Sequence, residues 1–135
     1  MKALDTNVLA RFFIDDADDP QAARQRPAAV AALSERAFGP VTVILEFEWV
    51  MRGFYHLPRR EVLAVLRALA GIEHITMEDR DVVLVALDAF DAGLDFGDAL
   101  HMSRSAHAAA FATFDQRLAR RATGLATAPT VELLR

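Results

Sequence analysis

The sequence contains no cysteine, and this absence excludes disulfide bonds and thiolate metal sites. No apolar run approaches the ~18 residues that a membrane-spanning helix needs. Asp5 interrupts the first apolar stretch too early for a signal peptide. Lysine occurs only as Lys2, and the formal net charge of −4 does not favour nucleic-acid binding by the chain as a whole. These absences predict a soluble protein, and the lack of cysteine fits a reducing cytoplasm.

The residues that are present suit one compact domain, since 53% of the 135 residues are hydrophobic and 25% are charged. Short strands and longer helices alternate in the expected element order. The expected strands cover residues 2–4, 40–43, 73–75, 109–113 and 130–133. The expected helices cover residues 6–13, 28–37 with Pro27 at the first position, 45–54, 60–70, 82–90, 95–106 and 116–122. Strands separated by helices predict a parallel sheet covered on both faces, which is a three-layer α/β/α sandwich.

Acidic residues stand where two of the expected strands end. Asp5 follows the first strand and Asp115 follows the fourth. Because the carboxyl ends of parallel strands line the functional crevice of an open sheet, we expect these two side chains to meet. Glu46 lies on the apolar face of the third expected helix, and Asp98 lies in the first turn of the sixth. The pattern therefore predicts a cluster of four carboxylates.

Each of these acids also has a structural interpretation. Asp5 and Asp115 are placed to cap the helices that follow them. Asp95 and Asp98 have the three-residue spacing of a capping box. Four carboxylates in one crevice would nevertheless repel one another, so that either several stay protonated or a cation neutralises them. Mg²⁺ or Mn²⁺ suits such an all-oxygen site.

Four segments of the chain resemble the signature segments of the PIN domain, in the right order and spacing. They read ALDTNVLAR, VILEFEWVMR, DFGDALH and ATFDQRL. The resemblance is closest to the VapC-type toxin ribonucleases of toxin–antitoxin pairs, and it covers essentially the whole chain. It implies a single PIN domain over residues 1–135, with a five-stranded parallel sheet in the order 3-2-1-4-5.

The resemblance also implies which residues act. The catalytic and metal-binding acids of the family correspond to Asp5, Glu46, Asp98 and Asp115. In the segment LEFE the family spacing selects Glu46, whereas Glu48 precedes Arg52 by four residues and favours a surface ion pair. The supporting polar residues are Thr6, Asn7, Asp95 and Thr113.

The chemistry that this resemblance implies is hydrolysis of phosphodiester bonds in RNA by a Mg²⁺- or Mn²⁺-dependent endoribonuclease. RNA requires local positive charge, for which Arg11, Arg117, Arg120 and Arg121 are candidates. The last three have an equally good interpretation as a solvated helix end favoured by the helix dipole. The implied partners are an RNA substrate, a VapB-like antitoxin and a second copy of the chain in a homodimer.

Three alternatives stay open. A PIN-type nuclease of RNA processing would act without an antitoxin. A phospho-receiver would need a lysine at a late strand end, yet Lys2 is the only lysine. A non-catalytic binding module would be expected to lack one of the acids. His101 follows Asp98 by one turn and is either a metal ligand, an acid–base group or a hydrogen-bonded histidine near the core.

Overall fold

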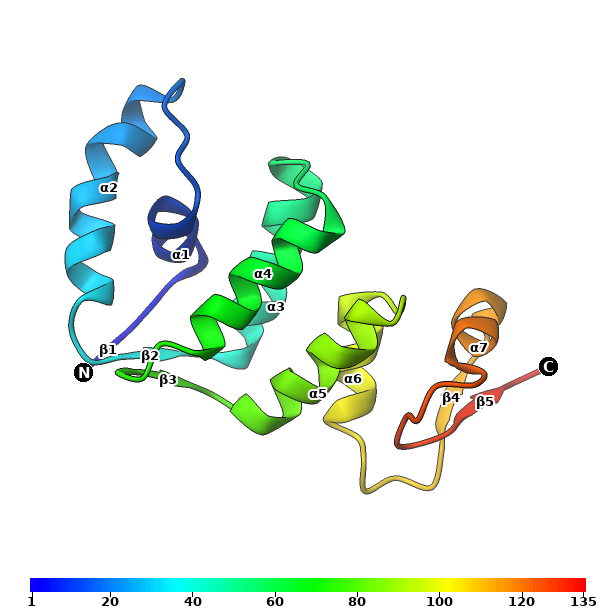
Figure 1. Cartoon of the computed structure of the whole chain (residues 1–135). Coiled ribbons are helices and arrows are strands. Elements are labelled where there is room, and N and C mark those ends of the chain that lie inside the picture. Colours follow the sequence, from blue (N-terminus) through cyan, green and yellow to red (C-terminus); the bar gives the residue numbers. More distant parts are fainter. The chain divides into compact units, whose positions relative to one another are not determined.

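The computed structural model describes residues 1–135, and the chain divides into two compact units, Met1–Arg80 and Asp81–Arg135 (Figure 1). The first unit contains β1 (Lys2–Ala3), α1 (Thr6–Phe13), α2 (Pro20–Leu33), β2 (Ala37–Gly39), α3 (Val41–Trp49), the π-helix η1 (Val50–Phe54), α4 (Arg59–Ala70) and β3 (Ile75–Met77). The second contains α5 (Arg80–Asp91, which begins at the boundary), α6 (Phe96–Ser103), β4 (Phe111–Thr113), α7 (Gln116–Ala122) and β5 (Val131–Leu133). No helix combines the length and the apolar character that crossing a membrane requires.

The strands form two parallel sheets rather than one. In the first unit β2 lies between β1 and β3, with Ala37 opposite both Lys2 and Ile75. In the second unit β4 pairs with β5, with Phe111 opposite Val131. The α/β class and the parallel pairing are confirmed, and the orders 3-2-1 and 4-5 match the two parts of the predicted order. The prediction of one five-stranded sheet is wrong, because three strands form one sheet and two strands form the other.

The helices at residues 6–13 and 116–122 have the bounds that the sequence predicts. The second helix does not begin at Pro27. It begins at Pro20, because Asp19 occupies the N-cap and its Oδ1 accepts hydrogen bonds from the N–H groups of Gln21 and Ala22. Pro27 consequently lies inside α2, where sequence reasoning did not place it.

The second strand is also displaced from its predicted position at residues 40–43. It ends at Gly39, and Pro40 is the N-cap residue of α3. The N–H of Val41 donates to Oε1 of Glu78 at 2.8 Å, so a carboxylate from the end of β3 satisfies the first turn of α3. The apolar run after Pro40 is therefore helical.

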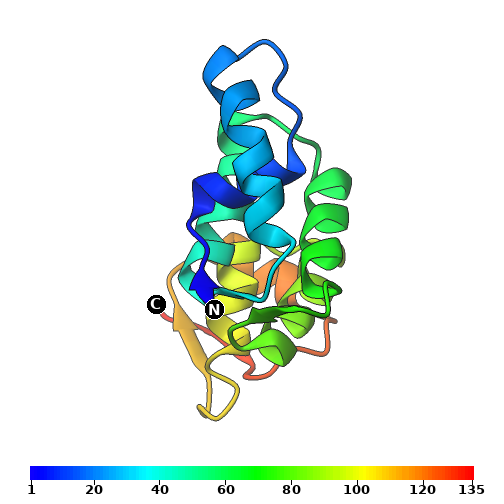
Figure 2. The same cartoon turned by 90° about the vertical axis from the view of Figure 1, so that its left-hand side faces the viewer.

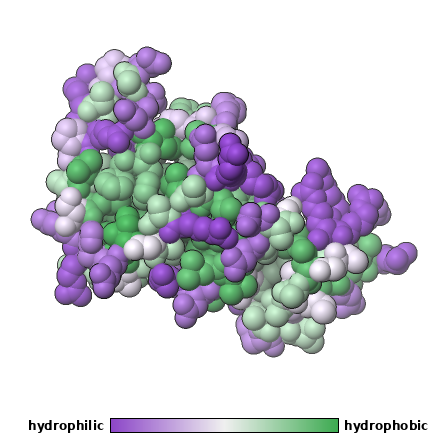
Figure 3. Space-filling model, in the orientation of Figure 1, coloured by the Kyte–Doolittle hydropathy of each residue, from purple (hydrophilic) through white to green (hydrophobic).

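The core of the first unit lies between α1, α3 and α4, where Leu9, Ile44, Phe47 and Leu66 are fully buried. The ring of Phe13 lies 5.9 Å from that of Phe47, which ties α1 to α3. Helices α1 and α2 lie side by side in both views (Figure 2). Apolar residues also reach the surface around α1, between α2 and α4 (Figure 3).

One carboxylate belongs to this core. The Glu48 side chain is 2% exposed and pairs with Arg52. The Arg52 Nε lies 2.8 Å from Oε2 of Glu48, and the Arg52 Nη2 lies 3.3 Å from Oε1. The predicted i,i+4 pair is thus confirmed, but its predicted surface position is wrong for Glu48. Spacing identifies which side chains meet on a helix, whereas the face that is buried depends on the packing of α3.

We expect the substitution Arg52→Met to lower the free energy of unfolding by about 3 kcal/mol, because it leaves a buried carboxylate without its cation. The double variant Glu48→Gln with Arg52→Met removes that charge and should recover part of the loss. Urea denaturation of the three proteins measures both effects. Equal destabilisation of the single and double variants would show that the loss is packing rather than charge.

Candidate functional site

The first unit holds two of the predicted acids in one pocket. Asp5 follows β1 and Glu46 lies on α3, and the two carboxylates are joined through the buried Thr6. The Thr6 N–H donates to Oδ1 of Asp5 at 2.7 Å, and the Thr6 hydroxyl donates to Oε1 of Glu46. Both acids line a pocket of about 350 Å³, and both are exposed. One threonine therefore orients two carboxylates that can bind a cation.

Helix capping explains these acids only in part. An N-cap side chain normally accepts from the second or third helical N–H group. Asp115 does so, because its Oδ1 accepts from Arg117 and Leu118 at 2.9 and 3.0 Å. Asp5 occupies an N-cap position but accepts from the first helical N–H, that of Thr6. The structural interpretation is thus complete for Asp115 and incomplete for Asp5.

Other walls of the first-unit pocket supply a cation and aromatic surface. Arg11 lines the pocket, and its guanidinium donates to Gln25 Oε1 at 2.9 Å and to the Tyr55 hydroxyl at 3.1 Å. The predicted supporting residue Asn7 lines the same pocket. Trp49 also lines it and is 59% exposed.

The second unit holds the other two acids. Asp98 and Asp115 line a pocket of about 250 Å³ together with Asp95, Arg117 and Arg121. Two of the arginines expected to attract RNA therefore stand beside the carboxylates. They are one helical turn apart on α7.

The supporting residues of the second unit make the contacts that their positions suggest. The Thr113 hydroxyl accepts the N–H of Asp115 at 3.0 Å, which steadies the start of α7. Asp95 is the N-cap of α6, and its Oδ2 accepts the N–H of Asp98 at 3.2 Å, which is half of a capping box. Arg120 is exposed and does not line the pocket.

Burial raises the pKa of Asp98 above its ordinary value of 3.8, and the negative charges of Asp95 and Asp115 raise it further. His101, which is exposed rather than near the core, partly opposes this rise in the pKa. A carboxylate that resists ionisation because of its neighbours gains from a bound cation. The three carboxylates of this pocket offer oxygen ligands and therefore fit a hard divalent ion such as Mg²⁺.

The four predicted acids are distributed two to each unit. Asp5 and Glu46 lie in the first unit, and Asp98 and Asp115 lie in the second. No group of three or more histidine, cysteine or acidic side chains is arranged in the structure to hold a metal ion. The expectation that all four acids meet stays a prediction.

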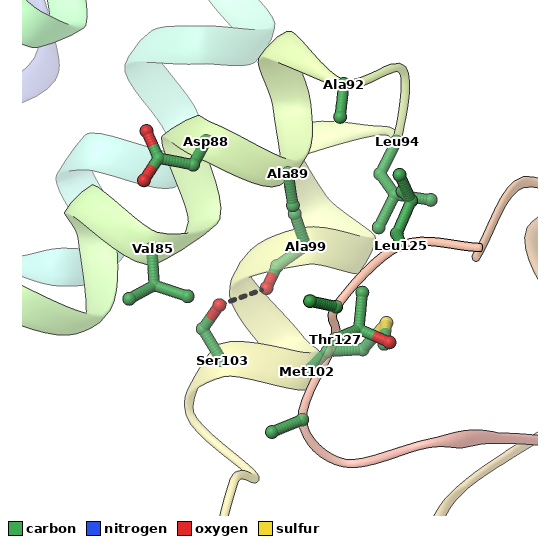
Figure 4. Close-up of a pocket in the computed structure, with 12 residues that line it drawn as sticks. Val85, Asp88, Ala89, Ala92, Leu94, Ala99, Met102, Ser103, Leu125 and Thr127 are labelled. Atoms are coloured by element: carbon green, nitrogen blue, oxygen red, sulfur yellow. Dashed lines mark hydrogen bonds between the residues drawn. The ribbon is translucent and has the colours of Figure 1, made fainter. Parts of the chain in front are cut away.

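The second unit also has an apolar hollow of about 270 Å³ between α5, α6 and the segment 125–128 (Figure 4). Small side chains such as Ala89 and Ala99 leave this space, and the Ser103 hydroxyl that borders it donates to the Ala99 carbonyl at 2.8 Å. None of the four predicted acids lines the hollow. Sequence reasoning missed it because scattered alanines carry no functional signal.

A family model described as PIN domain matches residues 2–124, a span that includes the four acids. Among curated proteins, none matches the chain.

The raised pKa of Asp98 predicts how stability depends on pH. The folded state holds the Asp98 proton more tightly than the unfolded state, so ionisation of Asp98 lowers stability as pH rises from 3.8 through the raised pKa. We expect metal-free Asp98→Asn to melt above the wild type at pH 7, with a difference that shrinks as the pH is lowered through this window. Thermal melts in chelator measure it, and Glu132→Gln on β5 is the control. An Asp98→Asn protein that melts below the wild type at every pH would contradict the electrostatic interpretation.

Proposed function

Because the chain belongs to the PIN domain family, we propose that it is a metal-dependent nuclease that hydrolyses phosphodiester bonds in RNA. The family match spans both units, which supports a single PIN domain over residues 1–135. The observation that carries the proposal is the composition of the two pockets. Each is lined by acids at the positions of the PIN signature segments, and each also contains arginine.

The proposal assigns Asp5, Glu46, Asp98 and Asp115 to binding Mg²⁺ or Mn²⁺. When bound, such an ion lowers the pKa of a water molecule and stabilises charge on the scissile phosphate. Thr6 orients two of the carboxylates through the hydrogen bonds that it donates. The capping bonds of Asp5 and Asp115 use Oδ1, so Oδ2 of each carboxylate is available to the cation.

The arginines of the two pockets offset part of the negative charge of the acids, which would otherwise repel a polyanion such as RNA. Arg11, Arg117 and Arg121 line the pockets that contain the acids. Guanidinium groups bind phosphate strongly and keep their charge at any physiological pH. In the proposal these arginines hold the RNA backbone while the carboxylates hold the metal.

The finer part of the proposal is that the enzyme is a VapC-type toxin. Its support is the resemblance of four segments, in order and spacing, to that class. The toxin would act on cytoplasmic RNA as a homodimer and would be inhibited by a VapB-like antitoxin. The alternative is a PIN-type nuclease of RNA processing that has no antitoxin.

We expect Asp5→Asn to reduce RNA cleavage by at least about 100-fold, because a neutral amide binds a hard dication far more weakly than a carboxylate does. Capping should persist, since asparagine caps a helix about as well as aspartate. The measurement is cleavage of labelled single-stranded RNA with Mg²⁺ or Mn²⁺, beside the melting temperature. Asp18→Asn in the exposed loop is the control. Wild-type cleavage by Asp5→Asn, or full cleavage in chelator, would refute the metal mechanism.

The toxin assignment has a separate test. Expression of the wild-type protein in a bacterial host should arrest growth, whereas expression of Asp5→Asn should not. If a small gene adjoins this one and encodes the antitoxin, its co-expression should restore growth. A wild-type protein that cleaves RNA in vitro but leaves growth unchanged would favour the RNA-processing alternative.

A further inference from the structure

We propose that the aromatic side of the first-unit pocket is a stacking platform, on which the Trp49 indole receives an unpaired RNA base beside the acids. The platform consists of Trp49, Phe54 and Tyr55. The inference rests on the proposed nuclease function and deepens it, because it names the part of the site that selects single-stranded substrate.

The platform and the acids belong to the same pocket. Trp49, Phe54 and Tyr55 line it together with Asp5 and Glu46. Trp49 follows Glu46 by three residues on α3, so the two side chains occupy one face of the helix. The Trp49 side chain is 59% exposed and that of Phe54 is 67% exposed. Two large exposed aromatic side chains that line the same pocket as two acids mark a binding surface.

The aromatic rings of the platform make contacts within the first unit. A Cβ atom at Gly53 would lie 3.4 Å and 3.5 Å from two atoms of the Trp49 indole, so the ring rests against the η1 backbone where Gly53 has no side chain. The rings of Phe54 and Tyr55 pack edge to face with their centroids 4.9 Å apart. The Tyr55 hydroxyl accepts a hydrogen bond from Arg11. A rigid aromatic surface loses little entropy on binding.

The chemistry of the pocket favours a nucleotide over a protein segment. Arg11 offers a guanidinium to a phosphate and the aromatic side offers a face to a base, so the pocket matches the alternation of charge and flat rings in a polynucleotide. Its volume of about 350 Å³ suits a small planar group. Because every base has a π face, the platform should discriminate single strands from duplexes rather than one base from another.

The chain provides its own probe, since Trp49 is the only tryptophan. Titration of a short single-stranded oligoadenylate into the wild-type protein, in chelator to prevent cleavage, should quench the Trp49 fluorescence in a saturable manner. The matching duplex should quench much less. Repeating the titration with Mg²⁺ on Asp5→Asn, which should not cleave, reduces the repulsion between the acids and the RNA because this variant has one carboxylate fewer.

Variants then connect the platform to catalysis. Trp49→Ala should raise KM for single-stranded RNA by about fivefold or more, the lower end of what one lost base–aromatic stack costs, while kcat changes little. Trp49→Phe keeps an aromatic face and should retain most of the affinity. Val85→Ala on α5 removes an exposed apolar group outside the platform, so KM should stay at the wild-type value. Circular dichroism and melting temperature establish that each variant is folded.

The outcomes separate the platform from the nuclease. Cleavage by the wild type, with no quenching by oligoadenylate in either titration and an unchanged KM in Trp49→Ala, would overturn the platform and leave the nuclease standing. Saturable quenching without cleavage under any divalent ion would support the platform and refute the nuclease. A Trp49→Ala protein that cleaves RNA normally but no longer binds a co-expressed antitoxin would make this surface a protein interface, against the proposal.

Discussion

The hydrogen bond from the buried Thr6 to Glu46 joins the start of α1 to α3, and the first-unit pocket depends on it. Two carboxylates close together repel each other unless hydrogen-bond donors or cations stabilise their charge. Thr6 supplies two donors, its hydroxyl to Glu46 and its N–H to Asp5. The buried Thr6 thereby positions both acids, and aromatic residues line the same pocket.

Repulsion between neighbouring carboxylates also acts in the second unit, where different contacts oppose it. Asp98 lies among other carboxylates, and burial with their charges raises its pKa. Asp115 directs Oδ1 to the N–H groups of α7, and Arg117 from that helix lines the same pocket. Capping and cation binding therefore do not exclude each other at Asp115, because capping occupies one carboxylate oxygen.

The sequence predicts those features that a local pattern determines. Helix α7 has its predicted bounds because Asp115 caps it, and the i,i+4 pair of Glu48 and Arg52 follows from helix geometry alone. Patterns of this kind do not reveal tertiary packing. The burial of Glu48 depends on neighbouring helices, and the start of α3 after Pro40 depends on Glu78 from a distant strand. The division of the strands into two sheets has no local signal either.

The aromatic side of the pocket shows why the acids could be proposed from sequence and their surroundings could not. A carboxylate next to an expected strand end carries its functional signal in its own chemistry, whereas an aromatic residue is a core residue until its exposure is known. After α3 the chain continues as the π-helix η1, in which the Tyr55 N–H bonds to the Val50 carbonyl five residues earlier. Tyr55, which follows this turn, accepts a hydrogen bond from Arg11, and the Trp49 indole lies against the backbone at Gly53. π-Helices are frequent at functional sites, and here one places an aromatic surface beside two acids.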